Sequence, residues 1–367
     1  MWYGYSDADF AANGSSSVGD FSSLQNAEVH FRMRGELDNG LKIGGRIELN
    51  GETTGDQIDQ HYIVLAGGFG EFRLGSVNSG RYSYGWLTDA PAAGIGINSG
   101  WMSGFVAPLN NTGFRFRSPS RSTVIEASND ENKITYFTPR FDGFQLTASW
   151  TPRGHVITNN LIGSGGSNYF FSGPADENLI YTNGIDIGIS YINDFDGVGL
   201  RLQGGLATAD APNFAENAAL ESDVDDYFAY NGGIAVSYLG WDVAASFAVV
   251  DEPLCLGFTA TAVFPPGLCA SSNEGKSFNI GAGYSTGPWH FTLSYFRGQE
   301  EGLRDFPGLG NSGDEESEFV ALGASYLMGP GLRTSLAIVY TSFEDDFPGS
   351  AGNNDGISVV WGIHAGF

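Results

Sequence analysis

The sequence lacks any apolar run long enough to form a membrane-spanning helix. It is also poor in basic residues: 17 Lys and Arg stand against 42 Asp and Glu, which gives a formal net charge of −25. This excess of negative charge disfavours binding to nucleic acid or to an anionic lipid face, and it favours cations as companions. The composition therefore excludes a helical membrane protein and argues against a nucleic-acid partner.

An enzymatic function finds little support as well. The five histidines show no spacing that suggests a catalytic triad. Gly-rich stretches such as residues 163–166 lack the lysine that a phosphate-binding loop needs. We therefore expect no enzymatic activity and no cofactor.

What the sequence does contain is a two-residue hydrophobic period, repeated in sixteen segments of about ten residues, the length a tilted strand needs to cross a bilayer. The alternation is clearest in residues 144–150 (FQLTASW) and 289–295 (WHFTLSY). A soluble β-sandwich can also alternate, but aromatic residues at both ends of the apolar face favour a membrane barrel. The last nine residues, ending at Phe367, follow the same pattern.

The connections between these segments alternate in length. Seven are short turns, several with Asn-Gly or Asp-Gly, which supply the positive φ angles of tight hairpins. The other eight are longer and rich in Gly and Asp, as expected for extracellular loops opposite short periplasmic turns. The pattern predicts an all-β fold: one domain, residues 1–367, forming a 16-stranded antiparallel transmembrane barrel with periplasmic termini.

One connection, from about residue 78 to 132, is far longer than the others and contains apolar residues such as Trp86, Ile97 and Phe105. A loop of that length without sustained alternation usually has a function. Apolar side chains are better placed against the inner barrel wall than in water, so we expect at least part of this loop to enter the lumen. The alternative is an external cap or a contact between subunits.

Three stretches resemble the general porins of Gram-negative bacteria, in particular their alphaproteobacterial branch. They are residues 132–144 (NKITYFTPRFDGF), residues 68–75 (GFGEFRLG) and the terminal Phe367, which looks like the family's assembly signal. The resemblance implies a homotrimer of 16-stranded barrels in the outer membrane, in contact with its lipid and lipopolysaccharide. It also implies passive diffusion of small hydrophilic solutes and ions through a pore narrowed by the third loop.

Alternate residues of each predicted strand face the lipid and the lumen in turn, and this alternation predicts which side chains line the pore wall. A lipid-facing Arg would cost about 2 to 4 kcal/mol near the bilayer midplane, so the basic residues of the early strands should face the lumen. Arg is suited to this position because its guanidinium stays charged under almost any conditions. The alternative is ordinary ion pairing with glutamates of the same wall. The predicted basic patch consists of Arg32, Arg34, Lys42, Arg46 and Arg73.

Family members commonly set acids of the third loop opposite such a patch. Here residues 86–96 (WLTDAPAAGIG) hold a single acid and lack the Pro-Glu-Phe-Gly-Gly form. Asp89 is our first candidate, followed by Glu126 and Asp130; each could instead be a solvated loop acid. Acidic clusters between the strands, including residues 300–305, 314–316 and 344–346, are interpreted as solvated extracellular loops that could bind Ca²⁺.

Cys255 and Cys269 are the only cysteines and lie in one expected loop. In an oxidising periplasm they predict a local disulfide, with two unpaired thiols as the alternative; two cysteines alone cannot form a zinc site. For the whole chain we expect a diffusion channel that prefers cations. A saturable channel selective for a sugar, amino acid or anion is one alternative, and a non-conducting barrel adhesin or structural protein is the other.

Overall fold

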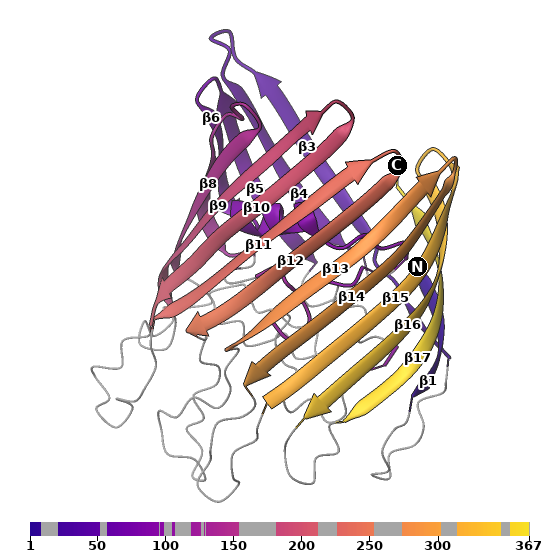
Figure 1. Ribbon diagram of the computed structural model, residues 1–367. Coiled ribbons are helices and arrows are strands. Elements are labelled where there is room, and N and C mark those ends of the chain that lie inside the picture. Colours follow the sequence, from indigo (N-terminus) through magenta and orange to yellow (C-terminus); the bar gives the residue numbers. More distant parts are fainter. Residues whose placement is uncertain are drawn as a thin grey trace, which may run out of the picture.

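Strands account for nearly all the regular structure in a computed structural model of the protein (Figure 1). The structure describes residues 1–8, 21–51, 57–94, 96–98, 105–106, 119–125, 128, 130–153, 181–211, 226–252, 274–301, 314–345 and 353–366. Within these ranges, 17 strands form one sheet, and each pairing between them is antiparallel. The predicted all-β barrel is confirmed.

The strands follow one another in chain order around the barrel. They are β1 (Trp2–Ala8), β2 (Phe21–Leu24), β3 (Glu28–Glu36), β4 (Lys42–Asn50), β5 (Ile58–Gly67), β6 (Gly70–Ser76), β7 (Asn132–Phe137), β8 (Phe144–Arg153), β9 (Thr182–Phe195), β10 (Val198–Asp210), β11 (Tyr227–Tyr238), β12 (Trp241–Glu252), β13 (Gly275–Thr286), β14 (Trp289–Glu301), β15 (Asp314–Gly329), β16 (Leu332–Asp345) and β17 (Asn354–Ala365).

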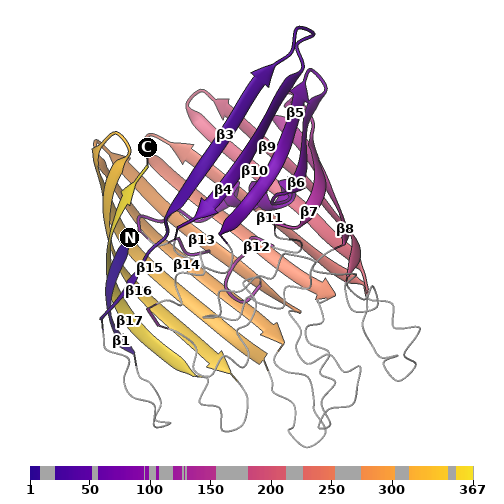
Figure 2. The same ribbon diagram turned by 180° about the vertical axis from the view of Figure 1, so that it is seen from behind.

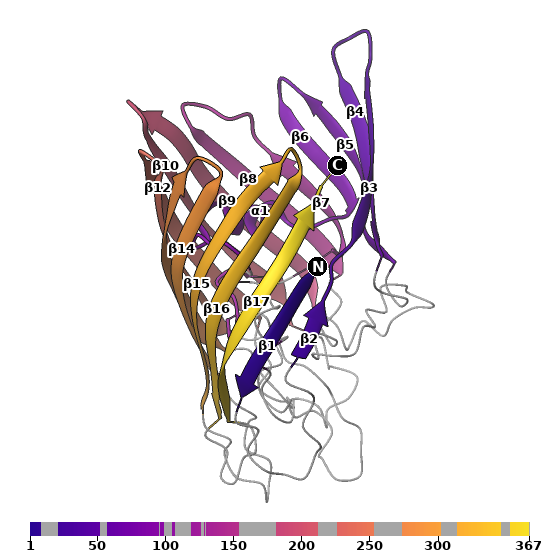
Figure 3. The same cartoon turned by 90° about the vertical axis from the view of Figure 1, so that its right-hand side faces the viewer.

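The predicted number of sixteen strands is reached because β2 and β3 occupy one position in the wall. β2 pairs with β1, with Trp2 opposite Leu24, and the chain continues through residues 25–27 into β3, which pairs with β4. β1 also pairs with β17, which joins the first and last strands of the sheet; the described residues show no pairing between β2 and either β3 or β4. Figure 3 shows β2 beside β1 and β3 leading away from it. On that edge β3 has no paired strand among the described residues.

Apolar side chains alternate onto the outer face, as the sequence predicts. In β17, Ile357, Val359 and Trp361 are exposed, whereas Ser358 and Val360 between them are buried. An apolar outer face is what a barrel in lipid requires. Aromatic pairs strengthen it near the short turns: the rings of Trp241 and Tyr284 lie 4.8 Å apart, and those of Trp289 and Tyr326 lie 4.7 Å apart.

The seven predicted short turns are present, and all lie at one end of the barrel (Figure 1). Their tight geometry uses positive φ angles, for example 48° at Leu239 and 85° at Gly240. The final described residues lie at the same end, because the amide of Gly366 donates to the carbonyl of Gly331, 2.8 Å away, in the last turn. Phe367 itself lies outside the described residues.

The interpretation of the acidic clusters as loops is wrong for several residues. Glu300 and Glu301 belong to β14, Asp314 to Glu316 belong to β15, and Glu344 and Asp345 belong to β16. Glu300 and Glu315 are directly opposite each other and are 1% and 2% exposed. The strands extend beyond the predicted alternation because, above the bilayer, neither face of a strand needs to be apolar.

The long connection between β6 and β7, residues 77–131, will be called the inward loop. It contains the short helix α1 (Gly80–Gly85) and the 3₁₀ helix η1 (Trp86–Thr88). The hydroxyl of Ser79 caps α1 by accepting from the amide of Tyr82 at 3.2 Å. Figure 3 shows α1 inside the ring of strands. Among the described residues, no helix has the length and apolar character needed to cross a membrane.

Candidate functional site

The described parts of the inward loop lie against the inner face of the barrel. The amide of Ala93 donates to the hydroxyl of Thr292 at 2.8 Å, and the hydroxyl of Ser277 donates to the carbonyl of Ser122 at 3.0 Å. The strand neighbours of these wall residues, such as Leu293 and Phe278, point outward and are exposed. The loop therefore occupies the lumen, which confirms that prediction.

A buried ion pair fixes the start of the loop to the wall. Arg81 of α1 contacts Asp186 of β9, with Nη2 2.6 Å and Nε 2.7 Å from Oδ1, and the two side chains are 1% and 2% exposed. The hydroxyls of Ser79 and Ser128 donate to the same carboxylate at 3.2 and 3.3 Å. Because Ser128 lies near the end of the loop, Asp186 holds both ends of it.

A second attachment closes the neck of the loop, where the chain leaves β6 and returns to β7. The ammonium of Lys133, which is 3% exposed, donates to the carbonyl of Val77 at 2.6 Å and to that of Ser128 at 3.3 Å. The hydroxyl of Ser76 donates to the carbonyl of Asp130 at 2.5 Å. These contacts join the two stems, so the loop is held as a closed unit.

The middle of the loop is held by a network of polar side chains. The side chain of Asn98 donates to the carboxylate of Asp89 at 2.6 Å and to the hydroxyl of Thr123 at 3.0 Å. That hydroxyl lies 2.6 Å from the hydroxyl of Ser246 on β12 and accepts from Asn279 on β13 at 3.0 Å. The loop is thereby connected to two further strands.

Small wall residues allow this close approach. A methyl group on Gly233 of β11 would overlap the side chain of Thr88, and one on Gly323 of β15 would overlap the carbonyl of Ala93. Further along the wall, Ile97 and Phe105 of the loop pack in one buried apolar cluster with wall residues, among them Trp2, Phe296, Phe319 and Phe343. Burial also raises the pKa of the Tyr84 hydroxyl in α1, so this phenol is neutral at ordinary pH.

The five basic residues predicted for the wall lie together. They line a hollow of about 710 Å³ on β3 to β6, shared with Glu36, Tyr62 and Glu71. Figure 2 shows these strands on the near side of the barrel, with β11 to β14, which contact parts of the loop, on the far side. No described loop residue lines the hollow.

Charges in the hollow are only partly paired. Arg73 contacts Glu71 at 2.7 Å, and Arg46 forms an ion pair with Glu48. Arg32 lies directly opposite Arg46 on the neighbouring strand, an arrangement of like charges that disfavours folding by itself. Basic side chains therefore outnumber acidic ones in the lining of this hollow.

The acids predicted for the loop do not gather at this hollow. Asp89 is half-buried and accepts from Asn98, with Asn279 at 3.5 Å. Asp130 is 8% exposed and lies at the neck of the loop. Glu126 and the two cysteines, Cys255 and Cys269, lie outside the described residues. The roles predicted for these residues remain predictions.

Sequence reasoning missed Arg81, Asp186 and Lys133. A signal for Asp186 exists: it is an acid between the outward-facing Ile185 and Ile187, so the parity of β9 places it on the inner face. An isolated inward charge needs a partner, and the inward loop is the segment able to supply one.

Fold and lumen together define a transmembrane β-barrel of the outer-membrane type, narrowed by an inserted loop. Residues 1–346 match the family described as Gram-negative porin. The chain belongs to this family, whose members lie in the outer membrane.

Relatives and solved structures agree with this assignment. A major outer membrane protein P.IB of Neisseria gonorrhoeae is 28% identical over 163 residues; the match covers 43% of this chain and 40% of the relative's length. The structure of Salmonella typhi OmpF in complex with daunomycin aligns over 99% of this chain and 96% of its own, with a TM-score of 0.58 and 15% identity. The outer membrane channel DcaP of Acinetobacter baumannii aligns over 98% and 94%, with a TM-score of 0.55 and 12% identity. These two structures support the fold.

Proposed function

We propose that the protein forms a water-filled channel for passive diffusion of small hydrophilic solutes and ions across the outer membrane. The observation that carries this proposal is that the inward loop and the charged hollow lie on different parts of the barrel wall. The described parts of the inward loop are held on the wall formed by β8 to β17 and β1, whereas the charged hollow on β3 to β6 has no described loop residue in its lining. A wall lined by charged side chains favours a hydrated path over an apolar one.

Ion selectivity depends on two opposing charges. The net charge of −25 attracts cations to the channel as a whole. The hollow, with five basic and two acidic side chains in its lining, attracts anions locally. We propose a moderate overall preference for cations, because the basic side chains are few compared with the acids of the chain.

Assembly as a homotrimer, with lipopolysaccharide around it, is part of the same proposal and rests on membership of the family. Binding of Ca²⁺ by the acidic extracellular segments also remains a proposal. Chemical crosslinking of the purified protein, with and without a chelator, tests both: trimers are expected, and their heat stability should fall when Ca²⁺ is removed if the ion binds between loops.

The decisive test is single-channel recording in a planar bilayer under a salt gradient. Conducting steps with a cation-directed reversal potential are expected. In the variant Arg32→Gln/Arg34→Gln, the reversal potential should move further toward cations, because two positive charges leave the hollow. Absence of conductance in folded protein would refute the channel, and flux that saturates with one solute would identify a selective channel instead.

A further inference from the structure

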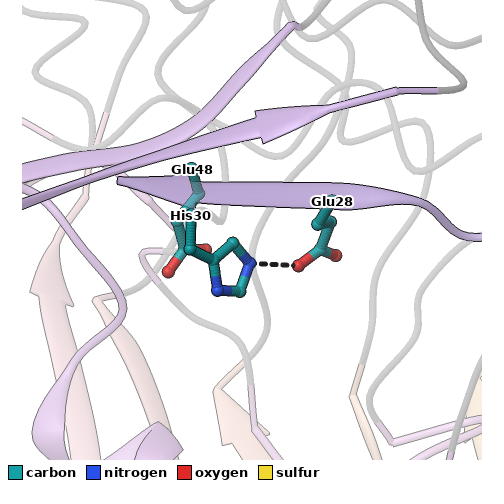
Figure 4. A group of neighbouring side chains, drawn as sticks. All are labelled: Glu28, His30 and Glu48. Carbon is teal, nitrogen blue, oxygen red and sulfur yellow. Dashed lines mark hydrogen bonds and ion pairs between the residues drawn. The ribbon is translucent and has the colours of Figure 1, made fainter. Parts of the chain in front are cut away.

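Three potential metal ligands converge at the loop end of β3 and β4, outside the five-residue basic patch (Figure 4). Glu28 and His30 are two positions apart on β3 and so share a face, and Glu48 of β4 is directly opposite His30. Nε2 of His30 lies 2.7 Å from Oε2 of Glu28. One ligand atom from each residue lies within 4.8 Å of the other two. Two carboxylates and an imidazole can thus approach a single ion.

We propose that Glu28, His30 and Glu48 bind a divalent cation of the Zn²⁺ class. Zn²⁺ accepts imidazole nitrogen and carboxylate oxygen at about 2.0 to 2.2 Å, which places the ligand atoms about 3 to 4 Å apart. Closing the three ligands around an ion therefore needs only small movements of their own side chains. Ca²⁺ binds six or more oxygen ligands and does not favour an imidazole nitrogen, so it fits this cluster less well.

Burial and access suit an ion that enters from the lumen. Glu48 is 3% exposed and forms the floor of the site. The side chains of Glu28 and His30 are 32% and 27% exposed, so an incoming ion can reach both of them. Three protein ligands leave further coordination positions on the lumen side for water.

The surrounding charge favours a cation as well. Asp59 of β5 lies close to both Glu28 and Glu48, so a third carboxyl group faces the cluster. Glu28, Glu48 and Asp59 thus place three acids at the cluster, and Arg46 contacts the cluster as a positively charged side chain.

Without a metal ion, the guanidinium of Arg46 supplies the positive charge beside His30 and Glu48. Its Nη2 lies 2.9 Å from Nδ1 of His30, and its Nε pairs with Glu48. Because a guanidinium can only donate, Nδ1 accepts, and Nε2 of the neutral ring carries the hydrogen toward Glu28. Binding of Zn²⁺ at Nε2 requires Arg46 to withdraw so that Nδ1 can take that hydrogen. Its side chain borders the hollow and has room to do so.

The test is calorimetric titration of the folded full-length protein in detergent with ZnCl₂, in a background of about millimolar CaCl₂ to saturate oxygen-only sites in the acidic segments. One Zn²⁺ per chain is expected. His30→Asn and Glu48→Gln should each weaken binding about tenfold or more, the scale typical of perturbed metal sites. Arg46→Gln should tighten it several-fold, because the competing cation is removed.

Arg32→Gln is the matched control. The substitution removes the same charge from the same hollow, directly opposite Arg46, but among the described residues Arg32 forms no hydrogen bond or ion pair with the three ligands. It should change the affinity for Zn²⁺ less than Arg46→Gln does. Circular dichroism verifies that each variant is folded, and the comparison of wild type with Arg46→Gln does not depend on the ligand variants.

Two results would overturn the proposal. One is the absence of saturable Zn²⁺ binding in both the wild type and Arg46→Gln. The other is an affinity that His30→Asn and Glu48→Gln leave unchanged, which would mean that the ion binds elsewhere. Since binding is measured directly, neither result depends on whether the channel conducts.

Discussion

Asp186 offers the sharpest test of how the inward loop is held. The substitution Asp186→Asn keeps the shape of the side chain but removes its charge, and leaves the guanidinium of Arg81 buried at 1% exposure without its counter-charge. Breaking a buried pair in this way costs about 3 to 5 kcal/mol. Because each 1.4 kcal/mol is about a factor of ten, the population with a detached loop should rise by about a hundredfold or more.

Single-channel recording and limited proteolysis measure this population. Asp186→Asn should give larger and noisier currents than the wild type, and proteases should cleave the inward loop faster. Arg201→Met is the control: Arg201 is a half-buried arginine of β10 that forms no ion pair among the described residues. It should leave both readouts near their wild-type values.

A double substitution distinguishes the effect of the Arg81–Asp186 ion pair from the effects of the two side chains taken singly. In Arg81→Met/Asp186→Leu neither charge of the pair remains, so the loop should be held better than in Arg81→Met or Asp186→Leu alone. If Asp186→Asn leaves current noise and cleavage unchanged, or if the double variant shows the sum of the two single effects, the buried pair does not hold the loop.

Two further predictions concern the wall. Gly233→Ala should displace η1 and destabilise the packing of the loop by about 1 to 3 kcal/mol, the usual range for overpacking, and the altered conductance reports this change. The control is Gly204→Ala, which should leave the conductance unchanged because the added methyl group meets only ordinary contacts. Equal effects of the two substitutions would refute the close approach of η1 to Gly233. Leu322→Arg, on the outer face of β15, should lower the free energy of unfolding in lipid vesicles by about 2 to 4 kcal/mol. Phe141→Arg, beside a turn, should lower it by only about 0 to 1 kcal/mol. Urea titration of both variants measures the difference, and similar losses would mean that Leu322 does not face the bilayer core.

Most of the fold follows from the sequence because the bilayer imposes its own pattern on the strands. Residues 144–150 alternate so regularly that β8 could be placed from them, and the turn at Leu239-Gly240 was located from its flanking strands. The pattern is lost where the bilayer ends: Glu300 and Glu315 lie in strands that continue past it, whereas the end of the alternation predicts loops at these positions. β2 was missed because its four residues are too short to show a period.

The lumen was predictable only in part. The basic patch was found because parity and the cost of a lipid-facing charge fix the side of the sheet on which Arg32 and Arg34 lie. The pairing of Arg81 with Asp186 joins residues 105 positions apart, and no local pattern relates them. The cluster of Glu28, His30 and Glu48 depends on the register of β3 against β4, which the turn at residues 37–41 sets but which parity alone does not reveal.

The seam between β1 and β17 has a consequence for assembly. Met1 and Ile363 exchange backbone hydrogen bonds across 362 positions of sequence, so the ring cannot close until the last strand has been made. Contacts of such high sequence separation form slowly, because the chain between them must first be ordered. Until that step, β1 and β17 each present an unpaired edge able to join another chain. Barrel closure should therefore be the slow, aggregation-sensitive stage of folding, governed by the two ends of the sequence rather than by the lumen.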